Sequence, residues 1–215
     1  MGTQNISFDL AILANGEIPQ GPGLDVLREV PVLVACDGAY ATALQLGREP
    51  DLTVGDGDSL DVKIQNQLGA RFVRVDEQVT NDLAKAFRVA RIRYSNCRRI
   101  AILGAGGGRE DHLLDNIFRL PGFAREIPGV ILMTNAGRFG VVSQARQFSS
   151  HPGDPVSIFA PYPDTHIESK GLKWPLQGVD VSELYSAVHN AASEDSFKLK
   201  TNRPIIVYRP FTNLK

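Results

Sequence analysis

The sequence has few of the residues that would cross-link a chain through disulfides or anchor it in a membrane. It contains two cysteines, Cys36 and Cys97, and their spacing matches no metal-binding pattern. Two such cysteines in a chain of 215 residues are expected to remain reduced thiols, which fits the cytoplasm. No apolar run approaches the roughly 20 residues that span a bilayer, and the N-terminus lacks a basic segment followed by a long apolar stretch. We therefore expect a cytoplasmic protein that is neither exported nor bound to a membrane.

Net charge is also nearly absent. The 23 basic and 24 acidic residues leave a formal charge of -1, so no overall field attracts nucleic acid or an anionic membrane. Neither is an expected partner, and any charged ligand has to be held by a local cluster. Hydrophobic residues make up 43% of the chain, which is enough for one large core or two modest ones.

The first 120 residues alternate short β-rich runs with helical patterns, apart from an irregular loop expected at Gly16–Gly23. Strands are expected at Asp9–Ala14, Val32–Cys36, Leu52–Val54, Arg71–Val75 and Ile100–Leu103. Apolar residues recur at helical spacing in the segments Tyr40–Leu46, Leu60–Leu68, Asp82–Tyr94 and Asp111–Leu120. This alternation predicts a mainly parallel sheet with flanking helices.

The pattern changes after about Pro121. Apolar runs are now separated by Gly, Pro and Asp turns, which is typical of an all-β domain. The runs are Val130–Met133, Phe139–Val142, Val156–Phe159 and Ile205–Tyr208. We expect an α/β domain over residues 1–135 and an all-β domain over residues 136–215, with the boundary near Thr134 to Gly137. Ligands of open α/β sheets gather outside the carboxyl ends of the strands, so the first domain should hold the polar chemistry.

An acidic segment, Gly55–Ser59, follows one of the predicted strands. Its two carboxylates, Asp56 and Asp58, alternate with glycines that let the backbone turn tightly, so several hard oxygens can face a cation such as Mg²⁺. The alternative is an acidic surface turn. An EF-hand loop is disfavoured because Asp61 and Gln67 stand where Gly and Glu are required.

Two further polar sites stand at the end of a strand and at the start of a helix. Asp37 can either cap the helix that follows it or contact a ligand. Thr80 or Asn81 can cap the next helix, which leaves Asp82 and Lys85 three residues apart on one face. These two can form a simple ion pair, or they can serve a metal and a phosphate respectively.

A glycine-rich segment, Gly104–Gly108, lies between a predicted strand and a predicted helix. Successive glycines free backbone N–H groups to face an anion, the helix N-terminus adds its positive end, and Arg109 adds a fork for phosphate oxygens. The segment matches neither a Walker A loop nor a dinucleotide fingerprint. Asp111 can cap the helix, and His112 is more typical of a structural hydrogen-bonding residue than of a catalyst.

The segment Lys170–Leu176 contains the single tryptophan, Trp174. A large aromatic residue usually fills a core. The flanking lysines and Pro175 indicate instead an exposed or interfacial turn, and the sequence leaves both interpretations open.

Taken along the chain, five motifs resemble the thiamine pyrophosphokinase family over about Asp37 to Asn190. They are Asp37–Gly38, Gly55–Ser59, Thr80–Lys85, Gly104–His112 and Lys170–Leu176. The resemblance implies an N-terminal α/β kinase domain, a C-terminal β-sandwich, and a homodimer with the thiamine site between its subunits. It also implies attack of the thiamine hydroxyl on the β-phosphorus of ATP, which gives thiamine diphosphate and AMP.

The resemblance assigns roles residue by residue. Mg²⁺ and the ATP phosphates would be surrounded by Asp56, Asp58 and Asp82. The ATP and phosphate site would be lined by Asp37, Thr80, Lys85, Arg109, Asp111 and, with less support from the motif, His112. The expected catalytic set is Asp56, Asp58, Asp82, Lys85, Arg109 and Asp111.

Two residues of the second domain, Trp174 and Asn190, are expected near the thiamine. The family pattern has Ser-Asn followed shortly by an aromatic residue, whereas here His189 stands in the serine position and no aromatic residue follows closely. The contacts of the thiamine rings are therefore not assigned by the pattern.

The motif chemistry fits catalysis by in-line positioning and neutralisation of phosphate charge. Either Asp82 or Asp111 could accept the proton of the thiamine hydroxyl. One competing hypothesis is a metal-dependent phosphohydrolase that uses Asp56 and Asp58, although Leu60 departs from the DxDx(T/V) phosphatase signature. Another is a binding module that senses thiamine or nucleotide without turnover.

Overall fold

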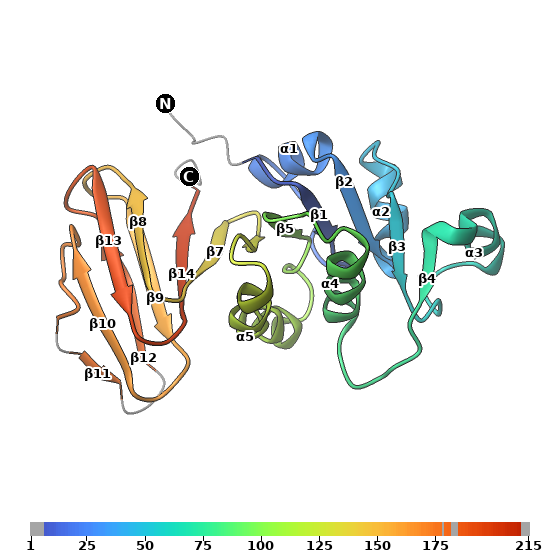
Figure 1. Cartoon of the computed structure of the whole chain (residues 1–215). Helices are drawn as coiled ribbons and strands as arrows, with labels where there is room; N and C mark the ends of the chain where they lie inside the picture. Colours follow the sequence, from blue (N-terminus) through green and yellow to red (C-terminus); the bar gives the residue numbers. More distant parts are fainter. Residues whose placement is uncertain (1–6, 178, 182–184, 212–215) are drawn as a thin grey trace. The chain divides into compact units, whose positions relative to one another are not determined.

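The computed structural model describes residues 7–177, 179–181 and 185–211, and it has a mixed α/β fold (Figure 1). The chain forms two compact units. Unit 1 comprises Met1–Ile117 and Glu126–Asn135, and unit 2 comprises Phe118–Arg125 and Ala136–Lys215. The domain boundary between residues 135 and 136 remains a proposal. Within the described part of the chain, no helix is long and apolar enough to cross a membrane.

Unit 1 contains a parallel sheet, as the alternating pattern predicts. Its strands are β1 (Leu10–Leu13), β2 (Val32–Cys36), β3 (Leu52–Gly55), β4 (Phe72–Arg74), β5 (Ile100–Leu103) and β6 (Ile131–Met133). Their order is β6-β5-β1-β2-β3-β4, and every neighbouring pair is parallel. The four residues of β1, like those of β5, are all buried, because a sheet covered on both faces takes continuous apolar runs.

Strand β6 lies on the N-terminal side of the expected boundary near Thr134 to Gly137, although its local pattern is that of the second half of the chain. The run Val130–Met133 groups by pattern with the β-rich second half of the chain, whereas β6 extends the parallel sheet beside β5. The reason is that a short apolar run has the same appearance in a parallel sheet and in a sandwich, so its partner decides its place.

The helices of the chain are α1 (Pro22–Glu29), α2 (Tyr40–Gln45), α3 (Val62–Leu68), α4 (Asp82–Arg93) and α5 (Glu110–Glu126). Helix α1 begins inside the stretch expected to be a loop, because Pro22 suits the first turn of a helix and Leu27 is fully buried. Helix α5 continues through Pro121 to Glu126, beyond the expected end at Leu120. Leu120, Phe123 and Ala124 are buried, and this burial offsets the backbone hydrogen bond that a proline removes.

Unit 2 is a β-sandwich. Its strands are β7 (Gly137–Val142), β8 (Ala145–Ser149), β9 (Pro155–Ala160), β10 (Thr165–Lys170), β11 (Val179–Val181), β12 (Tyr185–Ala191), β13 (Ser196–Thr201) and β14 (Ile205–Pro210). They form antiparallel sheets of order β12-β9-β14-β7 and β11-β10-β13-β8. The core includes Ile158 and Val207 from one sheet and Phe197 and Leu199 from the other. The expected all-β half is thereby confirmed as a sandwich.

Candidate active site

The carboxyl ends of three strands carry the polar motifs of unit 1. Asp37 follows β2 directly, Asp56 follows β3, and the glycine-rich segment follows β5. Strand β1 lies between β2 and β5, so the chain order reverses direction at the centre of the sheet. Such a reversal opens a crevice where ligands of doubly wound sheets bind.

Three carboxylates gather at this edge. Asp37, Asp56 and Asp58 each offer an oxygen atom, and these oxygens lie within 4.8 Å of one another. Asp37 is buried, and its two oxygens accept hydrogen bonds from the N–H groups of Gly38 at 2.8 Å and Gly57 at 2.9 Å. Asp37 therefore tethers the acidic segment to the end of β2 rather than capping the α-helix that follows.

The close approach of Asp37 requires a glycine at position 55. A Cβ atom on Gly55 would lie 2.2 Å from Cγ of Asp37, so any side chain there would displace the carboxylate. Burial raises the pKa of Asp37, and the charges of Asp82 and Asp56 raise it further, while the hydrogen bonds from the two glycine N–H groups act in the opposite direction. A bound cation would favour the ionised form of this carboxyl group.

Gln65 of α3 fixes the shape of the acidic segment from the other side. Its Nε2 donates to the carbonyl oxygens of Gly57 at 2.8 Å and Leu60 at 2.7 Å. Sequence reasoning missed this residue, since a glutamine on a short helix carries no motif. Its role follows only from the turn that places the two carbonyls beside it.

Asp56 is held ionised by local donors. It accepts the backbone N–H of Asp58 at 3.2 Å and Nε2 of Gln78 at 3.2 Å. These hydrogen bonds, with the backbone donor first, lower the pKa of Asp56 below its usual value. The side chain can thus present a carboxylate at neutral pH.

Lys85 connects the acidic segment to α4. It is 2% exposed, and its Nζ lies 3.0 Å from Oδ1 of Asp82 and 3.8 Å from Oδ2 of Asp56. Burial acts to lower the pKa of Lys85, but the hydrogen bond and charge of Asp82, with the charge of Asp56, outweigh it and the pKa is raised. The expected ion pair of Asp82 and Lys85 is thus present, and it extends to the metal-type cluster. The structure adds Asp37 to the candidate ligands, and the assignment of Asp82 to a metal stays a prediction.

Thr80 is positioned by Glu77, which sequence reasoning also missed. Glu77 accepts hydrogen bonds from the backbone N–H of Thr80 at 2.6 Å, from the hydroxyl of Thr80 at 2.9 Å and from the guanidinium of Arg88 at 2.8 Å. The Arg88 bond, followed by those from Thr80, lowers the pKa of Glu77 to about 2. Asn81 caps α4 by accepting the N–H of Ala84, as one of the two sequence alternatives expects.

The glycine-rich segment packs closely against the loop after β1. Gly107 has φ 73°, and a Cβ there would lie 2.4 Å from Cβ of Glu17, so both its conformation and its contacts require glycine. Arg109 and Asp111 pair with each other at 2.6 Å, and both are exposed. His112 is exposed as well, and its backbone N–H donates to Asp111. Arg109 is therefore accessible to an anion at this loop.

Asn116 joins the glycine-rich segment to α4. It is buried, its Nδ2 donates to the carbonyl of Ala105 at 3.2 Å, and its Oδ1 accepts from Asn81 at 2.9 Å. Asn81 also donates to Asp115 at 2.8 Å. The sequence places Asn116 one turn after His112 but gives no sign that it bridges two motifs.

We expect Asn116→Ala to lower the free energy of unfolding by about 1–3 kcal/mol, because it removes the donor to the carbonyl of the buried Ala105 and one of the two acceptors of the Asn81 amide. The KM for ATP should rise as well, since the glycine-rich segment loses an anchor. Urea unfolding and ATP saturation curves measure the two effects. Asn96→Ala is the matched control, as Asn96 is exposed, and it should change neither; equal behaviour of the two variants would contradict the bridging role.

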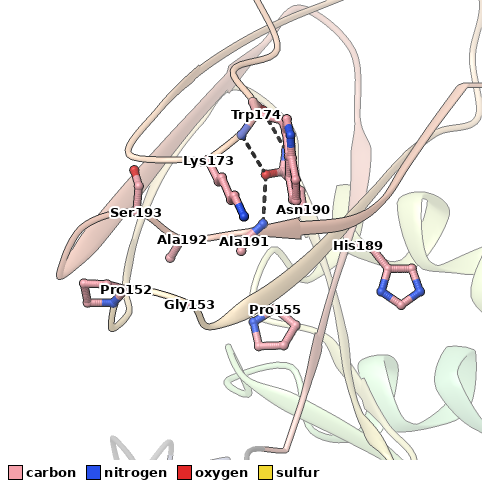
Figure 2. A pocket seen from close by; sticks show the side chains of 10 residues that line it. All are labelled: Pro152, Gly153, Pro155, Lys173, Trp174, His189, Asn190, Ala191, Ala192 and Ser193. Atoms are coloured by element: carbon pink, nitrogen blue, oxygen red, sulfur yellow. Dashed lines mark hydrogen bonds between the residues drawn. The ribbon is translucent and has the colours of Figure 1, made fainter.

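In unit 2, Trp174 lies on the surface and not in the core. The side chain is 53% exposed, and Nζ of Lys173 lies 4.7 Å from the ring centroid. A pocket of about 510 Å³ opens beside it (Figure 2). It is lined by Pro152, Gly153, Pro155, Lys173, Trp174, His189, Asn190, Ala191, Ala192 and Ser193. Of the two sequence interpretations of Trp174, the exposed turn is confirmed.

Models of two protein families match the chain. The model described as thiamin pyrophosphokinase, catalytic domain, matches residues 24–131, and the one described as thiamin pyrophosphokinase, substrate-binding domain, matches residues 137–208. The chain belongs to the thiamin pyrophosphokinase family. The catalytic-domain match contains the acidic and glycine-rich motifs of unit 1, and the substrate-binding match contains Trp174 and Asn190.

Solved structures of thiamin pyrophosphokinases share the fold. A thiamin pyrophosphokinase family protein from Enterococcus faecalis has a TM-score of 0.79 and 20% identity, covering 95% of this chain and 99% of its own. The enzyme from Bacillus subtilis gives 0.76 and 20%, covering 95% and 99%, and yeast thiamin pyrophosphokinase gives 0.73 and 16%, covering 97% and 88%. At these identities the likeness establishes the fold alone. A comparison with curated proteins gives no match.

Membership of the thiamin pyrophosphokinase family assigns an activity to the chain. It is a thiamine diphosphokinase that transfers pyrophosphate from ATP to the thiamine hydroxyl, giving thiamine diphosphate and AMP. The alternative of a phosphohydrolase built on Asp56 and Asp58 is not favoured.

Proposed function

We propose that unit 1 of this thiamine diphosphokinase binds ATP with Mg²⁺ at the carboxyl edge of its parallel sheet. The observation that carries the proposal is the convergence of three carboxylates, Asp37, Asp56 and Asp58, with the buried ammonium group of Lys85 beside them. A cation site next to a buried positive charge suits a polyphosphate, which needs both to balance its own charge.

The donor set fits Mg²⁺. Carboxylate oxygens are its preferred protein ligands, and the ion usually keeps several waters and is shared with substrate phosphates. Asp56 and Asp58 would hold it from the acidic segment, Asp37 from the turn after β2, and Asp82 from α4. Bound Mg²⁺ supplies neutralisation of the charge on the phosphate oxygens.

The remaining polar side chains of unit 1 have binding and positioning roles in this proposal. Lys85 and Arg109 bind phosphate oxygens, one from α4 and one from the glycine-rich segment. Thr80, Asp111 and His112 line the ATP and phosphate site. Asp82 or Asp111 accepts the proton of the thiamine hydroxyl as it attacks the β-phosphorus.

Thiamine binds at the exposed Trp174 of unit 2, with Asn190 next to it, in a cytoplasmic homodimer whose active site lies at the subunit interface. An aromatic face can stack on the flat rings of thiamine and attract its positive thiazolium. The carboxylates of unit 1 offer no such stacking surface. A half-exposed indole beside an open pocket also favours cover by a second copy. Light scattering measures the mass in solution, and a strict monomer with normal turnover would contradict the interfacial site.

The function is tested by identifying products under metal control. With ATP, thiamine and Mg²⁺, we expect AMP and thiamine diphosphate in equal amounts, no turnover after EDTA, and recovery when Mg²⁺ is restored. Omission of thiamine should stop AMP formation. Release of inorganic phosphate at the same rate without thiamine would identify a phosphohydrolase instead.

Arg109→Ala is expected to raise the KM for ATP by about tenfold or more and to leave the thiamine KM nearly unchanged, because the guanidinium is assigned to phosphate oxygens. Saturation curves for each substrate measure the effect. Arg93→Ala is a suitable control, as Arg93 is exposed at the far end of α4. A rise in the thiamine KM alone would contradict the assignment of Arg109 to the phosphate oxygens of ATP.

A further inference from the structure

Strand β12 carries one extra residue next to the Trp174 pocket. Ala187 pairs with Ile158 of β9 and Asn190 pairs with Val156, so β12 advances by one residue more than its partner. His189 lies within this bulge and has φ 62°, a left-handed conformation that costs free energy for any residue but glycine.

The bulge decides which side chain of β12 faces the sandwich core. Side chains alternate along a strand, so in a regular strand His189 would point to the same face as Ala187, and Asn190 to the opposite face. The extra residue reverses this order. Asn190 instead lies opposite the buried Val156 and is 3% exposed, while His189 is exposed.

The inward side chain of Asn190 is hydrogen-bonded to the backbone of Trp174. Its Nδ2 donates to the carbonyl of Trp174 at 2.8 Å, and its Oδ1 accepts the N–H of Trp174 at 3.2 Å and the N–H of Ala191 at 2.8 Å (Figure 2). The N–H of Lys173 donates to the carbonyl of Ala191 at 2.8 Å and continues this pairing. The amide of Asn190 is thus occupied by main-chain groups on both of its polar atoms.

The indole itself has little side-chain support. Trp174 is 53% exposed, and the described contact to its ring is the cation–π contact of Lys173. In Figure 2 the imidazole of His189 projects away from the Trp174 and Asn190 pair. The orientation of the ring therefore depends on how firmly the backbone of Trp174 is held.

We propose that Asn190 is a positioning residue for thiamine binding, which holds the Trp174 backbone so that the indole stays at the pocket, and that the β12 bulge serves to turn Asn190 inward. The proposal rests on the proposed binding of thiamine at Trp174. It assigns the strained conformation of His189 to a backbone role. It also gives a role to the buried Asn190 at a position where an apolar residue could pack against Val156.

The single tryptophan allows a test that needs no ligand. Asn190→Ala removes all three hydrogen bonds, and Asn190→Asp keeps an acceptor for the two N–H groups but places an oxygen against the Trp174 carbonyl. We expect faster depolarisation of Trp174 fluorescence and stronger acrylamide quenching in both variants. The thiamine KM should rise about tenfold in Asn190→Ala, with kcat and the ATP KM nearly unchanged. Far-UV circular dichroism checks that each variant is folded.

Asn202→Ala is the matched control. Asn202 also bridges two main-chain groups of unit 2, the N–H of His166 at 2.8 Å and the carbonyl of Asp164 at 2.9 Å, but it does not line the pocket. This variant should leave both the Trp174 signal and the thiamine KM unchanged, so that a general loosening of the sandwich is distinguished from release of Trp174.

The outcomes separate the two proposals. Unchanged Trp174 depolarisation in folded Asn190→Ala would overturn the positioning role, and a raised thiamine KM with that result would mean that Asn190 touches the substrate directly. Loosened Trp174 with an unchanged thiamine KM would support the backbone grip and overturn the placement of thiamine at Trp174. Loosening by Asn202→Ala to the same extent would also overturn the positioning role.

Discussion

Replacement of Asp58 by asparagine is expected to lower kcat by about a thousandfold while the protein stays folded. The variant removes an anionic oxygen from the three-carboxylate cluster, and the described contact of the Asp58 carboxylate is a hydrogen bond from the exposed Ser59 at 2.9 Å. Asp56→Asn should behave in the same way, with the added loss of a charge 3.8 Å from Lys85. AMP formation at saturating Mg²⁺, ATP and thiamine measures the effect.

Asp61→Asn is the control for this prediction. Asp61 belongs to the same acidic stretch, but its carboxylate caps α3 by accepting the N–H of Lys63 at 2.7 Å, a role that asparagine also fills. Near-normal turnover is expected for Asp61→Asn. Normal turnover in Asp56→Asn and Asp58→Asn, with unchanged circular dichroism, would remove the metal role from the cluster.

Lys85→Met is expected to have the second largest effect, a loss of about a hundredfold or more in kcat/KM for ATP. The substitution keeps the apolar stem but removes the buried charge beside Asp82 and Asp56. Lys85→Arg should not restore activity, because the larger planar group does not fit the space of an ammonium that is 2% exposed. Saturation kinetics on the three proteins decide this.

Lys85→Met is also expected to change the pH dependence of stability. The pKa of Lys85 is raised in the folded state, so its contribution to stability is fully present below the unfolded pKa of about 10.4 and is lost as the pH rises through the folded value. The difference in unfolding free energy between wild type and Lys85→Met should therefore stay constant from about pH 7 to about pH 9 and shrink only above that range.

Lys63→Met serves as the control, since Lys63 is exposed and should show no such difference. A gap for Lys85→Met that grows as the pH rises from neutral toward the unfolded pKa would mean that the folded pKa of Lys85 is lowered, so that Asp82 and Asp56 do not outweigh its burial.

The sequence predicts those elements of the fold that are specified locally. The runs Val32–Cys36 and Ile100–Leu103 become β2 and β5 without change, because each is a short apolar run between polar turns. Helix α1 is missed because its glycines and proline indicate a loop, and the buried Leu27 that stabilises it is a tertiary effect. The continuation of α5 through Pro121 has the same origin, as burial overrides local propensity.

The residues of the candidate site likewise fall into those that the sequence predicts and those that only the folded structure reveals. Asp56, Asp58 and Arg109 are visible from the sequence because their chemistry is carried by adjacent glycines and by position after a strand. Gln65 and Asn116 are not visible, since each acts by bonding to main-chain groups that only the folded structure brings near. The inward turn of Asn190 likewise depends on the pairing of β12 with β9, which no local pattern reveals.

The central claim is that the hydroxyl of thiamine attacks the β-phosphorus of ATP. ATP radiolabelled at the β-phosphorus in one reaction and at the γ-phosphorus in another tests it directly. Both labels should appear in thiamine diphosphate in equal amounts, and AMP should carry neither. Transfer of the γ label alone, with formation of ADP, or its release as inorganic phosphate, would contradict the account.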